Sequence, residues 1–98
     1  MIINFDDLLR NYSSNTKRNY ISITKNFFEN KKVGEITVAD FTEIKVQEVE
    51  AWIEKLKKQG IAQKTINTKI TGLSTLCKLI SNNYNCPVNS AFDGLRKN

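Results

Sequence analysis

Histidine is absent from this sequence, which removes the side chain that most often acts as a general base or metal ligand near neutral pH. No serine can therefore form a Ser-His-Asp triad. The two cysteines, Cys77 and Cys86, have no histidine to complete a zinc site, and their spacing matches no metal motif. Phosphate-binding and dinucleotide-binding glycine patterns are also missing. We expect a protein without metal or cofactor that does no chemistry by itself.

Long apolar runs are absent as well. No segment approaches the roughly 20 apolar residues that a membrane-spanning helix needs, and no signal peptide opens the sequence. We therefore expect a cytoplasmic protein with reduced thiols and no membrane partner.

Acidic residues are missing from two long segments of a chain whose formal net charge is +5. Residues 8–28 carry four basic side chains and no acidic one, and residues 55–92 carry six lysines and no acidic residue. The segment between them, 29–54, carries seven acidic residues against three basic ones. An ordinary lysine-rich surface is one interpretation, but surface helices normally mix charges of both signs. The pattern favours a polyanionic partner, and nucleic acid before a membrane surface.

Apolar residues recur at helical spacing in four segments, at about residues 4–12, 14–31, 46–59 and 62–81. No strand pattern competes with them. The last segment has the strongest stripe, formed by Ile66, Ile70, Leu73, Cys77 and Ile80. The sequence therefore predicts an all-α fold, a compact bundle of four main helices in one domain.

Local residues predict where the helices begin and end. Either Ser13 or Ser14 can cap the second helix, and Thr37 to Asp40 resembles a capping box that starts a short additional turn. Gly60 lies where a left-handed residue is expected after the third helix.

Three aromatic side chains and one thiol receive specific predictions. Tyr12 and Tyr20 lie on apolar stripes and are expected in the core, and Cys77 is expected to be a packed, unreactive thiol. Trp52 lies at the edge of the third stripe, where it either closes the core or anchors an interface.

The outward face of the last predicted helix is unusually rich in threonine and asparagine. Its members follow helical offsets of 0, 3, 4, 7, 11 and 14 and are Lys64, Asn67, Thr68, Thr71, Thr75 and Lys78. Thr and Asn are poor helix formers, so their placement costs helix stability unless they serve a contact. Short hydroxyls and amides between lysines suit phosphates and base edges. Simple tolerance of threonine on an exposed face is the alternative.

The second predicted helix has a similar outward face. Arg18, Ser22 and Lys25 follow offsets of 0, 4 and 7, with Asn19 nearby and Lys17 closer to the apolar edge. The free backbone N–H groups at the starts of both helices could cap the helix, take phosphate oxygens, or do both.

Three segments together resemble a known family. They are Ser14–Tyr20 (SNTKRNY) with Phe27, Val49–Gly60 (VEAWIEKLKKQG), and Gln63–Asn67 (QKTIN) continued by Ile70, Leu73 and Leu76. Their order and spacing resemble the SAM-like core-binding domain of tyrosine recombinases of the phage-integrase type, over residues 3 to about 95. The resemblance implies a helical DNA-binding domain over 1–88 and the start of a linker over 89–98. One departure concerns that boundary, because Ser90 follows Asn89 where the family often has Asn-Pro.

The resemblance implies that the second and fourth helices approach the major groove while a C-terminal catalytic domain clamps the duplex from the other side. Together with the outward faces, it gives these candidate DNA-binding residues: Thr16, Lys17, Arg18, Asn19, Ser22, Lys25, Lys64, Thr65, Asn67, Thr68, Thr71 and Lys78. The implied partners are double-stranded DNA, the catalytic domain of the same parent chain, and other recombinase protomers on DNA. The isolated domain is expected to be a monomer in the bacterial cytosol.

The same family implies a parent protein that integrates or recombines the DNA of a phage or another mobile element. That reaction needs a nucleophilic tyrosine within a cluster of Arg, Lys and His, whereas the only arginines here, Arg10, Arg18 and Arg96, are widely separated. We therefore expect a non-catalytic part of the recombinase. Two alternatives stay open. One is a helical protein-interaction module that uses either the surface around Glu48, Glu50 and Trp52 or the basic face. The other is a helix-turn-helix regulator whose last helix is the recognition helix.

Overall fold

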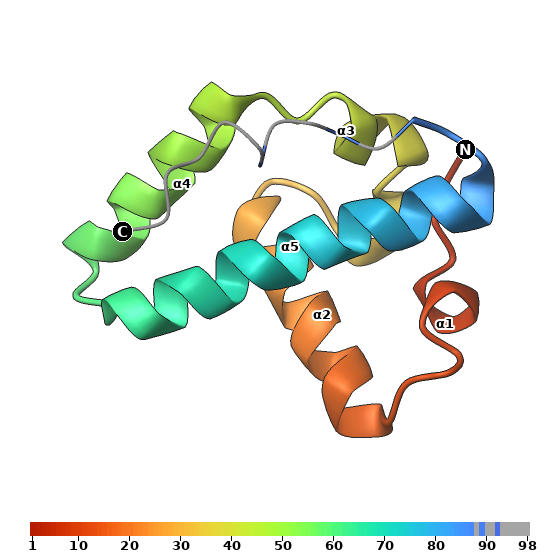
Figure 1. Ribbon diagram of the computed structural model, residues 1–98, viewed down its shortest axis with the longest axis horizontal. Coiled ribbons are helices and arrows are strands. Elements are labelled where there is room, and N and C mark those ends of the chain that lie inside the picture. The colour runs from red at the N-terminus through yellow and green to blue at the C-terminus, as the bar shows by residue number, and fades with distance from the viewer. Residues whose placement is uncertain (88, 90–91, 93–98) are drawn as a thin grey trace.

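The chain folds into five α-helices and one 3-10 turn in the computed structural model, which describes residues 1–87, 89 and 92 (Figure 1). The elements in chain order are α1 (Phe5–Leu8), α2 (Ser14–Phe27), η1 (Val33–Glu35), α3 (Val38–Thr42), α4 (Val46–Lys58) and α5 (Gln63–Tyr84). Within the described residues the only extended pairing is an isolated antiparallel bridge between Ile2 and Thr37. The predicted all-α fold is confirmed, and α3 is a fifth, short helix.

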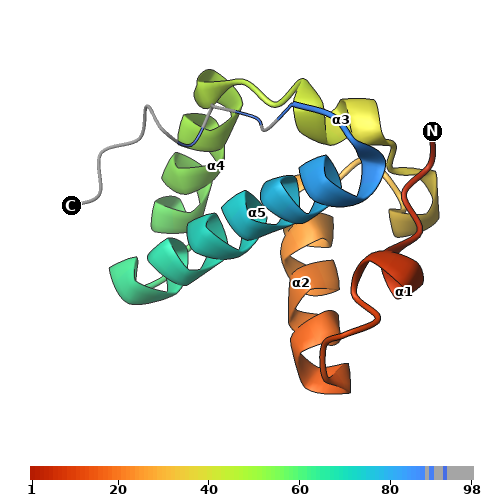
Figure 2. The same ribbon diagram turned by 45° about the vertical axis from the view of Figure 1, so that its right-hand side comes forward.

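Helix α5 is the central element of the fold. It runs along the whole molecule, with α4 on one side and α2 crossing on the other (Figures 1 and 2), and it packs against each of the other four α-helices. The stripe predicted from the sequence forms the centre of the core, because Ile66, Leu73, Cys77 and Ile80 are buried and Ile70 is half-buried. Burial of this stripe stabilises a helix that carries many poor helix formers on its other face.

Most helix ends lie where the local residues predict them. The Ser13 side chain accepts a hydrogen bond from the Thr16 N–H (3.3 Å). Gly60 has a φ of +80°, which is the left-handed conformation predicted for the residue after α4. Helix α5 ends three residues later than predicted, at Tyr84, and Asn85 adopts the left-handed conformation that closes it (φ +52°). Helix α2 ends earlier than predicted, at Phe27, because the chain turns so that the Phe28 ring packs against Phe41 (centroids 5.2 Å apart).

The capping box at the start of α3 is present as predicted. Thr37 accepts from the Asp40 N–H (3.2 Å), and the Asp40 carboxylate accepts from the Thr37 N–H (2.8 Å) and from Lys31 Nζ (2.6 Å). Burial acts to raise the pKa of Asp40, but the hydrogen bonds from Lys31 and Thr37 outweigh it and hold the pKa below its ordinary value of 3.8.

The first helix is shorter than predicted, and the expectation that Tyr12 is a core residue is wrong. Helix α1 ends at Leu8, since residues 9–13 turn the chain into α2. The Tyr12 side chain is left 37% exposed and covers Tyr20 edge-on, with ring centroids 5.6 Å apart. Half-buried Tyr20 is the residue of this pair that packs against the core.

Trp52 is buried, not at an edge. Helix α4 is rotated so that Val49, Trp52 and Leu56 face inward while Ile53 is half-buried. The Trp52 Nε1–H donates to Asn26 Oδ1 (2.8 Å), and its ring meets Phe27 edge-to-face (centroids 5.2 Å apart). The side chain therefore joins α4 to α2, as expected of a residue that closes the core and not of a free interface anchor.

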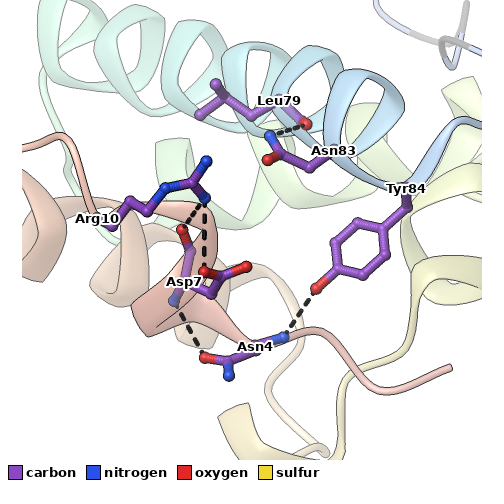
Figure 3. A network of polar contacts seen from close by, with 6 residues as sticks. All are labelled: Asn4, Asp7, Arg10, Leu79, Asn83 and Tyr84. Carbon is purple, nitrogen blue, oxygen red and sulfur yellow. Dashed lines mark hydrogen bonds and ion pairs between the residues drawn. The ribbon is translucent and has the colours of Figure 1, made fainter.

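Polar contacts join the start of the chain to the end of α5 (Figure 3). The Asn4 N–H donates to the Tyr84 hydroxyl (3.0 Å), while Asn4 Oδ1 accepts from the Asp7 N–H (3.1 Å) and caps α1. Arg10 is held on α1 by an ion pair with Asp7 (3.5 Å). The hydrogen bond between Asn4 and Tyr84 ties the start of α1 to the end of α5.

The segment after α5 returns to the helical body. Asn89 Nδ2 donates to the carbonyl oxygens of Phe41 (2.6 Å) and Ile44 (3.0 Å), and Phe92 packs against the core. Residues 88, 90–91 and 93–98, which include most of the predicted linker and Arg96, lie outside the described residues. The linker from residue 89 stays a prediction.

Candidate nucleic-acid interface

A groove opens between α2 and α5 on the side of α5 away from its apolar stripe. It has a volume of about 670 Å³. The lining residues come from both helices and are Thr16, Asn19, Tyr20 and Ile23 of α2 and Lys64, Asn67, Thr68, Thr71, Gly72 and Thr75 of α5. We call this feature the α2–α5 groove.

The groove exists because the two helices touch at one point and separate from there. At the crossing, a Cβ added to Gly72 would lie 2.5 Å from Ile23 Cδ1 and 3.9 Å from Tyr20 Cε1. Glycine at this position therefore permits a close approach at which any larger residue would require the terminal methyl of Ile23 to move. The N-terminal halves of α2 and α5 point apart in both views (Figures 1 and 2). Tyr20, Ile23 and Gly72 lie at the crossing, and all of the polar lining residues except Thr75 lie on the two separating arms.

The groove brings together half of the twelve predicted DNA-binding residues. These are Thr16, Asn19, Lys64, Asn67, Thr68 and Thr71. Thr75 lies on the same predicted face of α5 and also lines the groove. Tyr20, Ile23 and Gly72 were missed as groove residues, because an apolar stripe and a lone glycine indicate packing, and only the crossing of the helices shows that they also border an open surface.

The other six predicted residues do not line the groove. Arg18, Ser22 and Lys25 are exposed on the outer side of α2, and Thr65 and Lys78 are exposed on α5. Lys17 is partly buried and forms an ion pair with Asp6, because its place on the edge of α2 faces α1. Asp6 therefore compensates the positive charge of Lys17 in the free protein.

Several polar groups in the groove already have partners within the chain. The Thr68 hydroxyl donates to the Lys64 carbonyl oxygen (3.0 Å), and the Thr75 hydroxyl donates to the Thr71 carbonyl oxygen (2.9 Å). Both hydroxyl hydrogens are thereby engaged, so these residues offer a methyl group and acceptor lone pairs to the groove. Asn67 Oδ1 accepts from Gln63 Nε2 (3.0 Å), which leaves the NH₂ group as the donor end of this amide.

The two helices that border the groove are basic throughout. Neither α2 nor α5 contains an acidic residue. Within the described residues, five of their basic side chains form no ion pair: Arg18, Lys25, Lys64, Lys69 and Lys78. Helix α4, which lies on the opposite side of α5 from α2 (Figure 1), balances three glutamates with three lysines. The fold therefore concentrates uncompensated positive charge on the α2 and α5 side of the molecule.

A comparison with protein families identifies the domain. The model of the family described as phage integrase, N-terminal SAM-like domain, matches residues 2–81. The chain belongs to this family. Comparisons with curated proteins and with solved structures gave no match. The resemblance inferred from the three sequence segments is confirmed, and the chain is a domain type of tyrosine recombinases, whose catalytic function lies in another domain.

A second hollow of the SAM-like domain, about 420 Å³, lies between the end of α2 and α4 and is bordered by Phe27, Phe28 and Trp52. Its charged side chains include both signs, and Glu29 and Lys55 pair with each other across it. This hollow therefore lacks the one-sided charge of the α2–α5 groove and fits a polyanion poorly.

The groups that could do chemistry are few in the described part of the SAM-like domain. Burial raises the pKa of the Cys77 thiol to about 12, with a smaller contribution from Cys86, so the thiolate is scarcely populated at neutral pH. No three His, Cys, Asp or Glu side chains in residues 1–87, 89 and 92 are close enough together to hold a metal ion.

In the described residues, no helix combines the length and apolar character needed to cross a membrane.

Proposed function

We propose that this SAM-like domain binds duplex DNA with α2 and α5 as the DNA-gripping part of a tyrosine recombinase, and that strand cleavage belongs to a separate catalytic domain. The observation that carries the proposal is the α2–α5 groove, which gathers six predicted contact residues on two helices without acidic side chains. The partners are double-stranded DNA and the catalytic domain of the parent protein, in the cytoplasm, and the biological outcome is DNA integration or recombination.

The dimensions of the two helices suit the DNA major groove. An α-helix with its side chains is about 10–12 Å across, and the major groove is about 12 Å wide. Lys64 and Lys78 are 14 residues apart on one face of α5, which places them roughly 21 Å apart along the helix. Cations at that separation can contact phosphates on both borders of a major groove while the residues between them face the bases.

The salt dependence of binding follows from the number of uncompensated cations. If all five neutralise a phosphate, the slope of log K against log salt is about −4.5, from 0.9 per phosphate. Affinity should then fall by about 500-fold between 50 and 200 mM salt. Fluorescence anisotropy with a labelled duplex measures this slope directly.

A matched pair of lysine variants tests whether the charge acts through the proposed surface. Lys64→Ala removes a groove cation, and Lys32→Ala removes an exposed lysine that lies outside α2 and α5 and forms no ion pair within the described residues. Both variants have the same net charge. We expect Lys64→Ala to reduce the slope by about 0.9 and Lys32→Ala to leave it unchanged. Equal effects, or no binding by the folded protein at 50 mM salt, would contradict the proposal.

The two alternative functions have less support. In a helix-turn-helix protein, the helix before the recognition helix crosses the DNA backbone. Here that helix is α4, whose three lysines are balanced by three glutamates, whereas α2 and α5 are basic and contain no acidic residue. A protein-interaction module anchored on Trp52 is disfavoured because this side chain is buried against Asn26 and Phe27.

A further inference from the structure

The α2–α5 groove is rich in methyl groups, and part of its hydroxyl donors are already engaged within the chain. Four threonines line it, and the hydroxyl hydrogens of two of them, Thr68 and Thr75, are donated to the backbone of α5. The Ile23 side chain and the Cα of Gly72 add apolar surface at the crossing of the helices. The groove thus presents methyl groups beside the amides of Asn19 and Asn67.

This lining is less suited to phosphate groups than the surrounding basic surface. Phosphate oxygens are bound by cations and by N–H or O–H donors. Among the described residues, Lys64 in the first turn of α5 is the only basic side chain that lines the groove. Arg18, Lys25 and Lys78 lie outside the groove. Phosphates are therefore expected at the surrounding surface, and the centre of the groove is left for base edges.

We propose that the α2–α5 groove reads the major-groove edges of A·T base pairs. The inference rests on the proposed DNA-binding function and deepens it by naming the preferred class of sequence. The thymine C5-methyl is the one apolar group on the major-groove edges of the four base pairs, and it is matched by threonine methyl groups. Guanine is read mostly by arginine or lysine. Among the described residues that line the groove there is no arginine, and the one lysine, Lys64, lies at its end, in the first turn of α5.

Two amide side chains in the groove suit adenine. Asparagine reads adenine by donating to N7 and accepting from N6–H₂. Within the described residues, the Asn19 side chain forms no hydrogen bond with another residue, so both ends of its amide are available. Asn67 keeps its NH₂ group as a donor, while its oxygen, which accepts from Gln63, has a second lone pair. One groove thus offers amides for adenine beside methyl groups for thymine.

Three duplexes of equal length test the inference by competition anisotropy. The first is rich in A·T pairs, the second replaces each of its thymines by uracil, and the third has G·C pairs instead. Uracil removes only the C5-methyl and keeps the base-pairing groups. We expect the first duplex to bind most tightly and the uracil duplex to lose about fourfold for each methyl contact removed.

Variants of Thr71 connect that loss to the groove. Thr71 lines the groove, and its side chain forms no hydrogen bond with another described residue. Thr71→Ser removes its methyl and keeps its hydroxyl, whereas Thr71→Val keeps a methyl and removes the hydroxyl. We expect Thr71→Ser to reduce the discrimination between thymine and uracil and Thr71→Val to retain it. Thr42→Ser, which makes the same change at an exposed position on α3, should leave it unchanged.

The outcomes separate this inference from the function on which it rests. Equal, salt-dependent affinity for all three duplexes would overturn the A·T preference and leave DNA binding standing. A preference for A·T pairs that uracil does not weaken would overturn the methyl contact, and so would a preference for G·C pairs. Failure of the folded protein to bind any duplex at 50 mM salt would overturn both the inference and the proposed function.

Discussion

Replacing Gly72 by alanine tests the close approach of α2 and α5 that creates the groove. In the wild-type protein the new Cβ would lie 2.5 Å from Ile23 Cδ1, closer than two carbon atoms can pack. The terminal methyl of Ile23 must therefore move, although it is packed where only 9% of the residue is exposed. The truncation Ile23→Val removes that same methyl and leaves the rest of the contact in place.

The magnitudes follow from two opposing effects. Exchanging glycine for alanine inside a helix stabilises it by about 1 kcal/mol. Overpacking a well-packed site costs about 1–3 kcal/mol. We expect Gly72→Ala to lower the free energy of unfolding by about 0–2 kcal/mol in the wild-type protein. In the Ile23→Val background the same change should raise it by about 1 kcal/mol, which gives a coupling energy of about 1–3 kcal/mol.

Urea denaturation of the four proteins of this cycle measures the coupling, provided that the m-value stays constant. Thermal unfolding supplies a second measurement, since 1 kcal/mol corresponds to about 4–8 °C in a domain of this size. If Gly72→Ala changes stability equally in both backgrounds, Ile23 does not pack against Gly72, and the account of how the groove forms is wrong.

Three further predictions concern contacts outside the groove. Asn26→Ala should lower the free energy of unfolding by about 1–3 kcal/mol, measured by urea denaturation, because it leaves the buried Trp52 Nε1–H without its acceptor. A thiol reagent at pH 8 should modify half-buried Cys86 well before Cys77, whose pKa of about 12 keeps it protonated; equal rates would contradict the burial of Cys77. Because the folded-state pKa of Asp40 is lowered, its contribution to stability is complete above its ordinary value of 3.8 and is lost as the pH falls through the folded-state pKa. Asp40→Asn should therefore cost about 1 kcal/mol at pH 7 and clearly less near pH 2, and a cost independent of pH would refute this role.

The parts of the fold that the sequence predicts are those decided by local or periodic patterns. The stripe from Ile66 to Ile80 keeps one helical period over many residues, so it identifies both α5 and the centre of the core. The capping box from Thr37 to Asp40 is a local hydrogen-bond pattern and needs no tertiary information. Gly60 likewise has the positive φ that its place after α4 requires.

The parts that the sequence does not predict depend on how the helices turn relative to one another. Trp52 is buried because α4 rotates it toward Asn26, which lies 26 residues away in the sequence. Tyr12 is exposed because α1 ends before reaching it. Lys17 is paired because the loop after α1 places Asp6 beside α2.

The candidate site divides in the same way. Helical periodicity places Lys64, Asn67 and Thr71 on one face of α5, and the structure puts all three in the groove. Periodicity gives no information about where α2 crosses α5. The parts played by Ile23 and Gly72 therefore become visible only in three dimensions.

Binding of DNA by the surface of α2 and α5 is the central claim, and an NMR titration of the isotope-labelled protein with a short duplex tests it most directly. Spectra are recorded at low salt and then at higher salt. We predict amide shifts concentrated in residues 16–25 and 63–78 that are reversed by salt. Shifts centred on α4, or no shifts from a folded sample even at low salt, would contradict the claim.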